Sequence, residues 1–260
     1  MLPTQKTLSR RQVELKEEFT RQRGTWSDAW ESALRLDPDF LEAYLKFSLV
    51  PWKKNHLETK VKEFIYIAAD ASATHLYTPG IRQHIRAAIS CGATQEEIFE
   101  VLELTSTLGI HAVNIGVPLL LEVLVEEGLR TGPAPLDARQ QKLKQEFTET
   151  RGYWHPFWDG ILELDPELFE AYTHFSSVPW KSGVLEPKVK ELVYCAFDAA
   201  ATHLYAPGLK LHMRNALALG ASIQEIMEVL EIVSVIGIHA VTTAGPILMS
   251  ELEAFSVDSA

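Results

Sequence analysis

The sequence repeats itself over almost its whole length, and this repeat restricts the possible folds more than any other feature. Shifting the 260-residue chain by 128 residues aligns it with itself without a gap, and roughly half of the positions from Phe19 to Val113 are identical. A solenoid repeat is much shorter, roughly 20 to 50 residues. We therefore expect two copies of one domain, or of a half-domain that pairs with its copy, at residues 1–130 and 131–260. Gly and Pro in residues 130–135 mark the linker.

The matching segments keep residues of distinctive chemistry at the same relative positions. They are Trp26 with Trp154, Trp30 with Trp158, Val-Pro-Trp-Lys at 50–53 and 178–181, Thr-His-Leu-Tyr at 74–77 and 202–205, and Gly-Ile-His-Ala-Val at 109–113 and 237–241. Both copies therefore keep the same candidate functional residues.

Composition excludes several classes of protein. Hydrophobic residues make up 47% of the chain, which is enough for a buried core. The chain has 24 Lys and Arg against 35 Asp and Glu, so its net charge of −11 disfavours nucleic-acid binding. It has no run of about 18 apolar residues and no apolar signal in residues 1–19, so we expect neither a membrane span nor secretion. Two cysteines cannot build a disulfide framework, which favours the cytoplasm.

Hydrophobic periodicity predicts helices throughout the chain and no strands. Asp37-Pro38 is typical of a helix start, and residues 57–76 form a long apolar segment without Gly or Pro. Pro79-Gly80 predicts a break before a further helix, and residues 94–97 form a capping box that recurs at 222–225. The expected fold is therefore all-α, with two similar helical domains.

The order of the motifs resembles one known family. An E-x-x-x-A-Y-x-x-F segment precedes Trp-Lys and a K-x-K-E helix, followed by H-x-x-x-A-x-x-x-G-A-[ST], E-I-x-E-V-L and Gly-Ile. This order resembles the carboxymuconolactone decarboxylase family, which includes the alkyl hydroperoxidase D-like proteins. The match is strongest at residues 84–102 and in their copy from His212. The resemblance implies a small helical fold that forms homo-oligomers. Its members are either Cys-x-x-Cys hydroperoxidases or cofactor-free decarboxylases of lactone acids.

The cysteines argue against the hydroperoxidase branch of this family. In that branch the Cys pair lies a few residues before the histidine that matches His84, but residues 75–83 contain no cysteine. Cys91 and Cys195 lie at non-equivalent positions of the two copies. A thiol peroxidase needs an attacking thiolate and a resolving thiol close together. We therefore expect no thiol peroxidase activity.

Two carboxylates in each copy are candidate catalytic groups. Glu63 and Glu191 match the glutamate that the family carries on a helix. Glu63 and Asp70 fall on one helical stripe, and Asp70 is surrounded in sequence by apolar residues, as is its copy Asp198. One interpretation is a carboxylate pair in which one member has a raised pKa and acts as acid or base. The alternative is a buried ion pair that holds helices in register.

Three histidines recur in each copy. His84 and His212 match the family's helix histidine, and their position predicts that the imidazole points into packed structure; either proton transfer or a hydrogen-bonded core role fits. His75 and His203 lie where relatives carry catalytic residues, although this segment is about two residues longer than the usual family spacing. The third pair is His111 with His239.

Other candidates are less specific. The aromatic candidates to contact a substrate are Tyr66, Tyr77 and Trp52 with their copies, including Tyr205. Arg86 and Arg214 could attract a carboxylate, but we expect them to be solvated. The histidines and carboxylates could bind a metal, but no H-x-x-x-H or H-x-x-E-H spacing supports this, so we expect no metal.

The resemblance and the residues together predict a cofactor-free lyase that decarboxylates a small carboxylated lactone or other ring-fission product of aromatic catabolism. The expected catalytic residues are Glu63, His75, His84, Glu191, His203 and His212. The expected substrate-binding residues are Asp70, Tyr77, His111, Asp198, Tyr205 and His239. The expected partner is a small carboxylate, without nucleic acid or membrane. Two alternatives stay open: a non-catalytic binding or scaffold protein, and a metal-dependent enzyme that uses the His cluster.

Overall fold

The computed structural model describes residues 7–258, and side chains up to residue 256. All regular structure in this range is helical, and the two repeats have similar helices in the same order, as expected. The first repeat contains α1 Arg10–Arg23, α2 Asp28–Leu36, α3 Pro38–Ser48, α4 Val50–Lys53, α5 Thr59–Ala71, α6 Thr78–Ser90, α7 Gln95–Ser106 and α8 His111–Glu126. The second contains α9 Ala138–Arg151, α10 Phe157–Leu164, α11 Pro166–Ser182, α12 Pro187–Ala199, α13 Ala206–Ala218, α14 Ile223–Ser234 and α15 His239–Asp258.

The helix starts follow the sequence signals. Asp37 caps α3 by accepting from the Phe40 N–H, and the Thr94 and Ser222 side chains close reciprocal capping boxes at α7 and α14. One expectation was wrong in detail: Pro79-Gly80 does not interrupt the chain before a helix but lies in the first turn of α6. Proline is tolerated there because the first N–H groups of a helix have no partner within the helix.

The two central helices, α5 and α12, come from different repeats and pack against each other. Both are buried on almost every side, including fully buried Phe64, Ile65 and Leu192. A helix that is apolar all round needs neighbours on every face, and α7 and α14 supply them. The two repeats therefore share the main hydrophobic core, and a smaller cluster lies among α9, α10 and α11.

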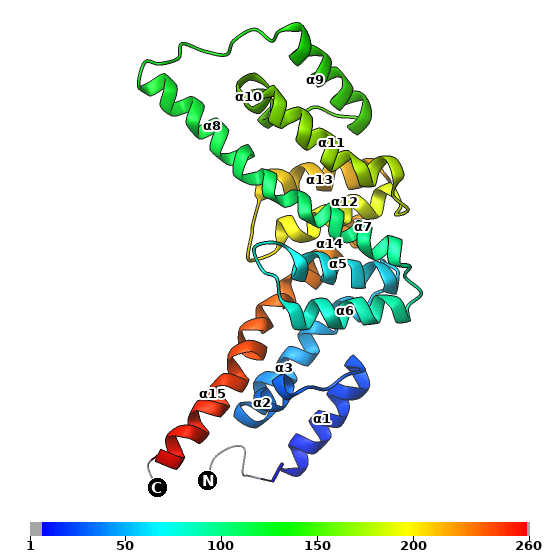
Figure 1. The fold of residues 1–260 in the computed structure, drawn as a ribbon. Coiled ribbons are helices and arrows are strands. Elements are labelled where there is room, and N and C mark those ends of the chain that lie inside the picture. The colour runs from blue at the N-terminus through cyan, green and yellow to red at the C-terminus, as the bar shows by residue number, and fades with distance from the viewer. Residues whose placement is uncertain (1–6, 259–260) are drawn as a thin grey trace.

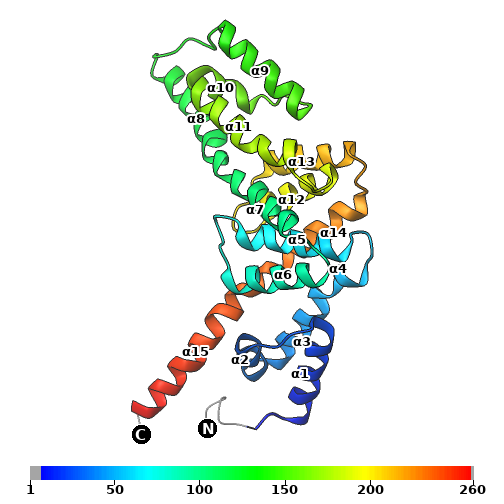
Figure 2. The ribbon, with the colours of Figure 1, turned by 45° about the vertical axis from the view of Figure 1, so that its right-hand side comes forward.

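Each repeat sends its last helix to the other repeat. In Figures 1 and 2, α15 runs away from the central helices along the first repeat, and α8 runs in the opposite direction along the second. Helix α15 packs against α2, and α8 packs against α10. Any cavity beside these contacts is therefore lined by residues of both repeats.

Buried ion pairs also connect the repeats. Lys62 and Glu228 lie 2.8 Å apart, as do Lys190 and Glu100, and all four side chains are almost fully buried. Lys62 donates to the carbonyls of Pro51 and Lys54 as well, so its charge is well solvated by the protein. Buried charges are tolerated only when they are paired and hydrogen-bonded in this way.

Two continuous helical stretches, residues 95–126 and 223–256, are long and apolar enough to span a membrane by length and composition. From the sequence we expected no membrane span. Length and composition alone do not support that expectation. Each stretch contains a short 3-10 turn, η2 at Thr107–Ile110 where α7 meets α8, and η3 at Val235–Ile238 where α14 meets α15. Helices α7 and α14 belong to the shared core, whereas α8 and α15 expose apolar side chains.

Candidate functional site

A buried carboxylate–imidazole pair joins α5 to α6. Glu63 Oε2 lies 2.7 Å from His84 Nδ1, and both side chains are more than nine-tenths buried. The Tyr66 ring stacks on the His84 ring, with 4.2 Å between the centroids and 3° between the planes. The carboxylate and the stacked ring fix the orientation of the imidazole. Nε2 is then the nitrogen left for a ligand or a proton transfer.

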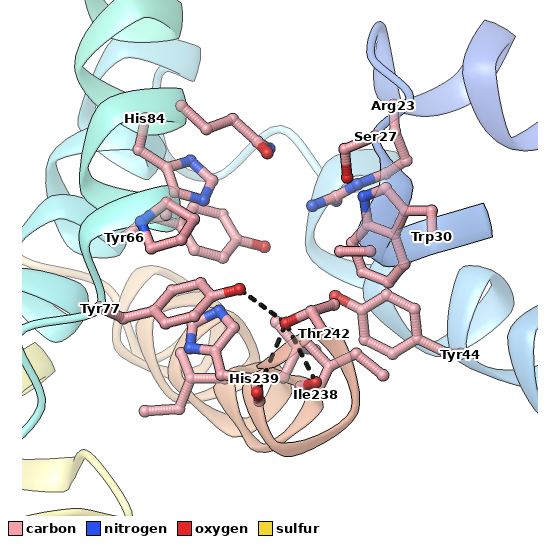
Figure 3. Close-up of a pocket in the computed structure, with 16 residues that line it drawn as sticks. Arg23, Ser27, Trp30, Tyr44, Tyr66, Tyr77, His84, Ile238, His239 and Thr242 are labelled. Atoms are coloured by element: carbon pink, nitrogen blue, oxygen red, sulfur yellow. Dashed lines mark hydrogen bonds between the residues drawn. The ribbon is translucent and has the colours of Figure 1, made fainter. Parts of the chain in front are cut away.

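An arginine at the end of α1 faces this pair. Helix α1 ends at Arg23 because Gly24 adopts a left-handed conformation (φ 71°), which glycine accepts without strain, and its N–H bonds to the Thr20 carbonyl. Figure 3 shows the Arg23 side chain reaching across the cavity toward His84 and Tyr66. Burial opposes the charge on Arg23, but the fields of Tyr66, Tyr44 and Glu63 outweigh it and raise its pKa, so it is cationic at all relevant pH values.

These residues line a cavity of about 80 Å³ that neither repeat completes alone. The first repeat supplies Arg23, Tyr66 and His84, and the second supplies a wall from η3 and α15 that includes His239 and Thr242 (Figure 3). The cavity continues into a larger outer pocket. The residues lining both are Arg23, Ser27, Pro79, Gln83 and His84. The Glu63–His84 pair and Arg23 therefore stand where a molecule entering from outside would reach the inner cavity.

The other candidate histidine, His75, lies away from Glu63 and pairs with the second repeat. Its Nε2 is 2.8 Å from Nδ1 of His239, the first residue of α15. Tyr77 stacks on His239 with 3.7 Å between the ring centroids, and its hydroxyl lies 2.7 Å from Thr242 Oγ1. His75 and Tyr77 thus form one cluster with His239, while Glu63 and His84 form another.

Asp70 does not pair with Glu63, although the two share a helix. The Asp70 carboxylate is fully buried, neither of its oxygens has a hydrogen-bond partner among the described residues, and Oδ1 lies 3.7 Å from His239 Nδ1. Burial raises the pKa of Asp70 to about 8. Burial and the neighbouring imidazole of His75 lower the pKa of His239 to about 3, so His239 is neutral. The expected carboxylate pair is therefore replaced by a carboxylate–imidazole pair at Glu63 and a separate carboxylate at Asp70.

The second repeat builds an equivalent site. Glu191 Oε2 lies 2.6 Å from His212 Nδ1, and Tyr194 stacks on His212 at 4.3 Å. The first repeat closes this cavity with η2 and α8, which contribute His111. His111 Nδ1 lies 2.6 Å from His203 Nε2 and stacks on Tyr205 at 3.9 Å.

The second cavity is smaller, about 20 Å³. Tyr153 lines it at the position that Thr25 occupies in the first repeat, and Thr25 lines only the outer pocket. Leu211 likewise stands where the first cavity has Gln83. The two sites are thus built on one plan but differ in size and polarity.

The arginines of the two sites were missed by the sequence analysis. Arg151, at the end of α9, corresponds to Arg23, and Gly152 ends its helix in the same left-handed conformation. Two of its guanidinium nitrogens, Nε and Nη1, are buried without a hydrogen-bond partner among the described residues. The sequence signal that could have identified both arginines is the Arg-Gly dipeptide, which recurs at residues 23–24 and 151–152. Arg86 and Arg214, by contrast, are exposed, as expected.

Neither cysteine lines an inner cavity, although Cys91 lines the outer pocket of the first site. Cys91 is exposed just after α6, and Cys195 is buried in α12, where burial raises its thiol pKa well above the ordinary value. Both are free thiols in different repeats. A buried protonated thiol is a poor nucleophile, in agreement with the argument against thiol peroxidase chemistry.

The fold and the paired sites define a tandem helical protein with composite acid–base cavities. The sequence profile of the carboxymuconolactone decarboxylase family matches residues 38–111 and 166–245, and the chain belongs to this family. Arg23 and Arg151 lie outside both matched regions, so a comparison restricted to the family core does not include them.

One solved structure is closely similar over nearly the whole chain. It is a crystal structure from Burkholderia xenovorans LB400 of a protein provisionally named as a gamma-carboxymuconolactone decarboxylase subunit. The two sequences are 61% identical, the match covers 94% of this chain and 98% of the other, and the TM-score is 0.90. A comparison with curated proteins gives no match.

Proposed function

We propose that this protein is a cofactor-free lyase that removes CO2 from a small carboxylated lactone or a related ring-fission product. The observation that carries the proposal is the buried Glu63–His84 pair at the wall of a cavity that also contains Arg23. Family membership and the name of the similar crystal structure support the same reaction class. The Glu191–His212 pair and Arg151 repeat the arrangement.

The reaction requires a proton donor and a conjugated group that accepts the electron pair left by the departing CO2. Breaking the bond to the carboxylate releases CO2 and leaves the electron pair on carbon, conjugated into an enolate. In our proposal His84 delivers a proton from Nε2 to that carbon, and Glu63 stabilises the imidazolium before transfer and keeps the ring in position. Water then returns the proton to His84. The net reaction consumes one proton and forms one C–H bond for each CO2 released.

Arg23 is suited to bind negative charge other than the carboxylate that leaves. A cation on the leaving carboxylate would stabilise the ground state and slow its loss, because catalysis requires stronger binding of the transition state. We therefore assign to Arg23 either a second carboxylate of the substrate or the enolate oxygen that develops in the reaction. Tyr66 and Tyr44, which also line the cavity, add aromatic surface and two hydroxyl groups to its wall (Figure 3).

Self-association belongs to the same proposal. The faces of α8 and α15 that their partner helices leave uncovered expose apolar side chains, among them Ile115, Leu119, Leu120, Val123, Ile247, Leu248 and Leu252. Contiguous exposed apolar faces on equivalent helices are typical of subunit interfaces. Light scattering behind size exclusion should therefore give a multiple of the 29.2 kDa chain mass, and a mass of one chain at micromolar concentration contradicts the proposal.

The direct test is a screen of carboxylated lactones and related ring-fission acids for CO2 release by the purified protein. A substrate that is decarboxylated without added metal or organic cofactor supports the proposal. If no acid in the series releases CO2, but some bind, the non-catalytic alternative gains support and the proposed activity fails.

A further inference from the structure

The structure brings together a second group of chemically active side chains, separate from the Glu63–His84 pair. The group consists of Asp70 at the end of α5, His75 in the following loop and His239 at the start of α15. One potential metal-ligand atom from each residue lies within 4.8 Å of the other two. Nδ1 of His239 is 2.8 Å from His75 Nε2 and 3.7 Å from Asp70 Oδ1. The same three residue types meet in the second repeat.

The copy in the second repeat uses the same atoms. His111 Nδ1 lies 2.6 Å from His203 Nε2 and 3.7 Å from Asp198 Oδ1. In both clusters two ligands come from one repeat and the third from the other. Agreement at the level of single atoms shows that the cluster is a built feature of the fold.

The carboxylates of both clusters, Asp70 and Asp198, have no hydrogen-bond partner in the described part of the chain, which indicates that a ligand is missing. Asp70 and Asp198 are fully buried, and none of their four oxygens accepts or donates a hydrogen bond among the described residues. Leaving a buried carboxyl group without a hydrogen-bond partner is unfavourable. A hydrogen bond between the two imidazoles would explain their contact but would leave the carboxylate unsatisfied.

The surrounding backbone is shaped to keep the carboxylate and the histidine in place. Gly80 packs directly on the Asp70 carboxylate, and any Cβ there would overlap it; Gly208 has the same relation to Asp198. Leu76, between His75 and Tyr77, adopts a left-handed conformation at φ 48°, and Leu204 does so at φ 51°. Such backbone strain in non-glycine residues concentrates at functional sites.

We propose that each Asp-His-His cluster binds one divalent transition-metal ion, so that the chain holds two. Two imidazole nitrogens and one carboxylate oxygen form a donor set typical of Zn²⁺ and Fe²⁺, whereas Mg²⁺ and Ca²⁺ prefer oxygen donors. Donors about 2.0–2.2 Å from one ion lie about 2.8–3.6 Å from each other, so binding requires the paired imidazole nitrogens, at 2.8 and 2.6 Å, to separate slightly. The ion would also satisfy the carboxylate. This inference is independent of the proposed decarboxylation, because it rests on a different set of side chains.

The test uses the full chain without a histidine tag, stripped with a chelator and titrated with Co²⁺ alone under anaerobic conditions. Calorimetry and the visible absorption of bound Co²⁺ should both saturate at two ions for each chain. His75→Ala should reduce this to one, and His75→Ala with His203→Ala should abolish binding. The matched control His84→Ala removes a buried histidine outside the cluster and should still bind two ions.

Circular dichroism checks that each variant is folded, and the nearly isosteric Asp70→Asn replaces His75→Ala if that variant does not fold. The inference is overturned if the wild-type chain takes up no Co²⁺ at concentrations equal to its own. It is also overturned if the folded double variant binds as much as the wild type. Because metal content is measured without turnover, a failure here leaves the proposed decarboxylation unaffected.

Discussion

Glu63 of α5 and His84 of α6 are held 2.7 Å apart inside a wall that the first repeat forms and the second repeat completes. The cavity beside the pair is therefore complete only when α15 of the second repeat packs against the first. This arrangement gives a physical reason for a tandem chain. Each copy supplies the acid–base pair of one site and closes the other.

Arg23 should stabilise either the bound substrate or the transition state of the reaction. Replacing it with Met keeps most of its length but removes the charge, and a hydrogen bond to a charged group contributes about 1.5–3 kcal/mol. We expect Arg23→Met with Arg151→Met to lower kcat/KM about 10-fold or more. Steady-state kinetics would measure this. Arg11→Met with Arg139→Met is the matched control on exposed arginines of α1 and α9, and an equal effect there would contradict the assignment.

The two sites should contribute unequally to turnover. Tyr153 narrows the second cavity at the position of Thr25, so a substrate should fit the first site better. His84→Ala should therefore lose more of the total activity than His212→Ala. Tyr153→Thr should increase the activity that remains in the His84→Ala background. Equal losses from the two histidine variants would show that cavity size does not control the reaction.

The buried ion pairs between the repeats should be important for stability. Glu228→Ala leaves the Lys62 ammonium buried without its counter-charge, 2.8 Å from where the carboxylate lay. Breaking such a pair from one side typically costs about 3–5 kcal/mol. Urea denaturation should show a loss of this size. Glu14→Ala, which removes the exposed partner of Arg10, is the control and should cost much less.

The ion pair between Arg130 in the linker and Glu163 should make the free energy of unfolding depend on pH below about 4.5. Arg130 donates two hydrogen bonds to Glu163, at 2.5 and 2.7 Å, and the Ala134 N–H donates a third; these bonds lower the pKa of Glu163 below its ordinary value of 4.5. The unfolded chain therefore binds the proton more tightly. The stabilisation is complete above pH 4.5 and is lost as the pH falls through the lowered pKa.

The matching measurement is the Tm of the wild type and of Glu163→Gln between pH 7 and pH 3. The difference should be largest near neutral pH and shrink below pH 4.5. Glu170→Gln removes an exposed ion pair with Arg139 and should change Tm little at any pH. A constant difference for Glu163→Gln across the range would rule out the titration of this carboxylate as the cause.

Local features of the fold could be predicted from the sequence because their causes are local. Capping boxes at Thr94 and Ser222, the Asp37-Pro38 start and apolar periodicity define the helices. Glu63 and His84 were both identified as candidates, since burial and family position point to the same helix faces. Their direct contact follows from α5 packing on α6, which are adjacent in the chain.

The contacts between repeats could not be predicted in the same way. The His75–His239 contact joins positions 164 residues apart, and no sequence pattern states whether α15 returns to its own repeat or crosses to the other. Arg23 was missed for a different reason. A basic residue at the end of a helix ordinarily indicates favourable interaction with the helix dipole, and only the tertiary structure directs this one into a cavity.

The central claim is that the two Glu–His pairs carry the chemistry, and CO2 release by Glu63→Gln with Glu191→Gln tests it most directly. General acid–base groups contribute about 10²–10⁴ in rate, so with a substrate found in the screen kcat should fall at least 100-fold while circular dichroism stays unchanged. A folded double variant that releases CO2 at the wild-type rate would contradict the account.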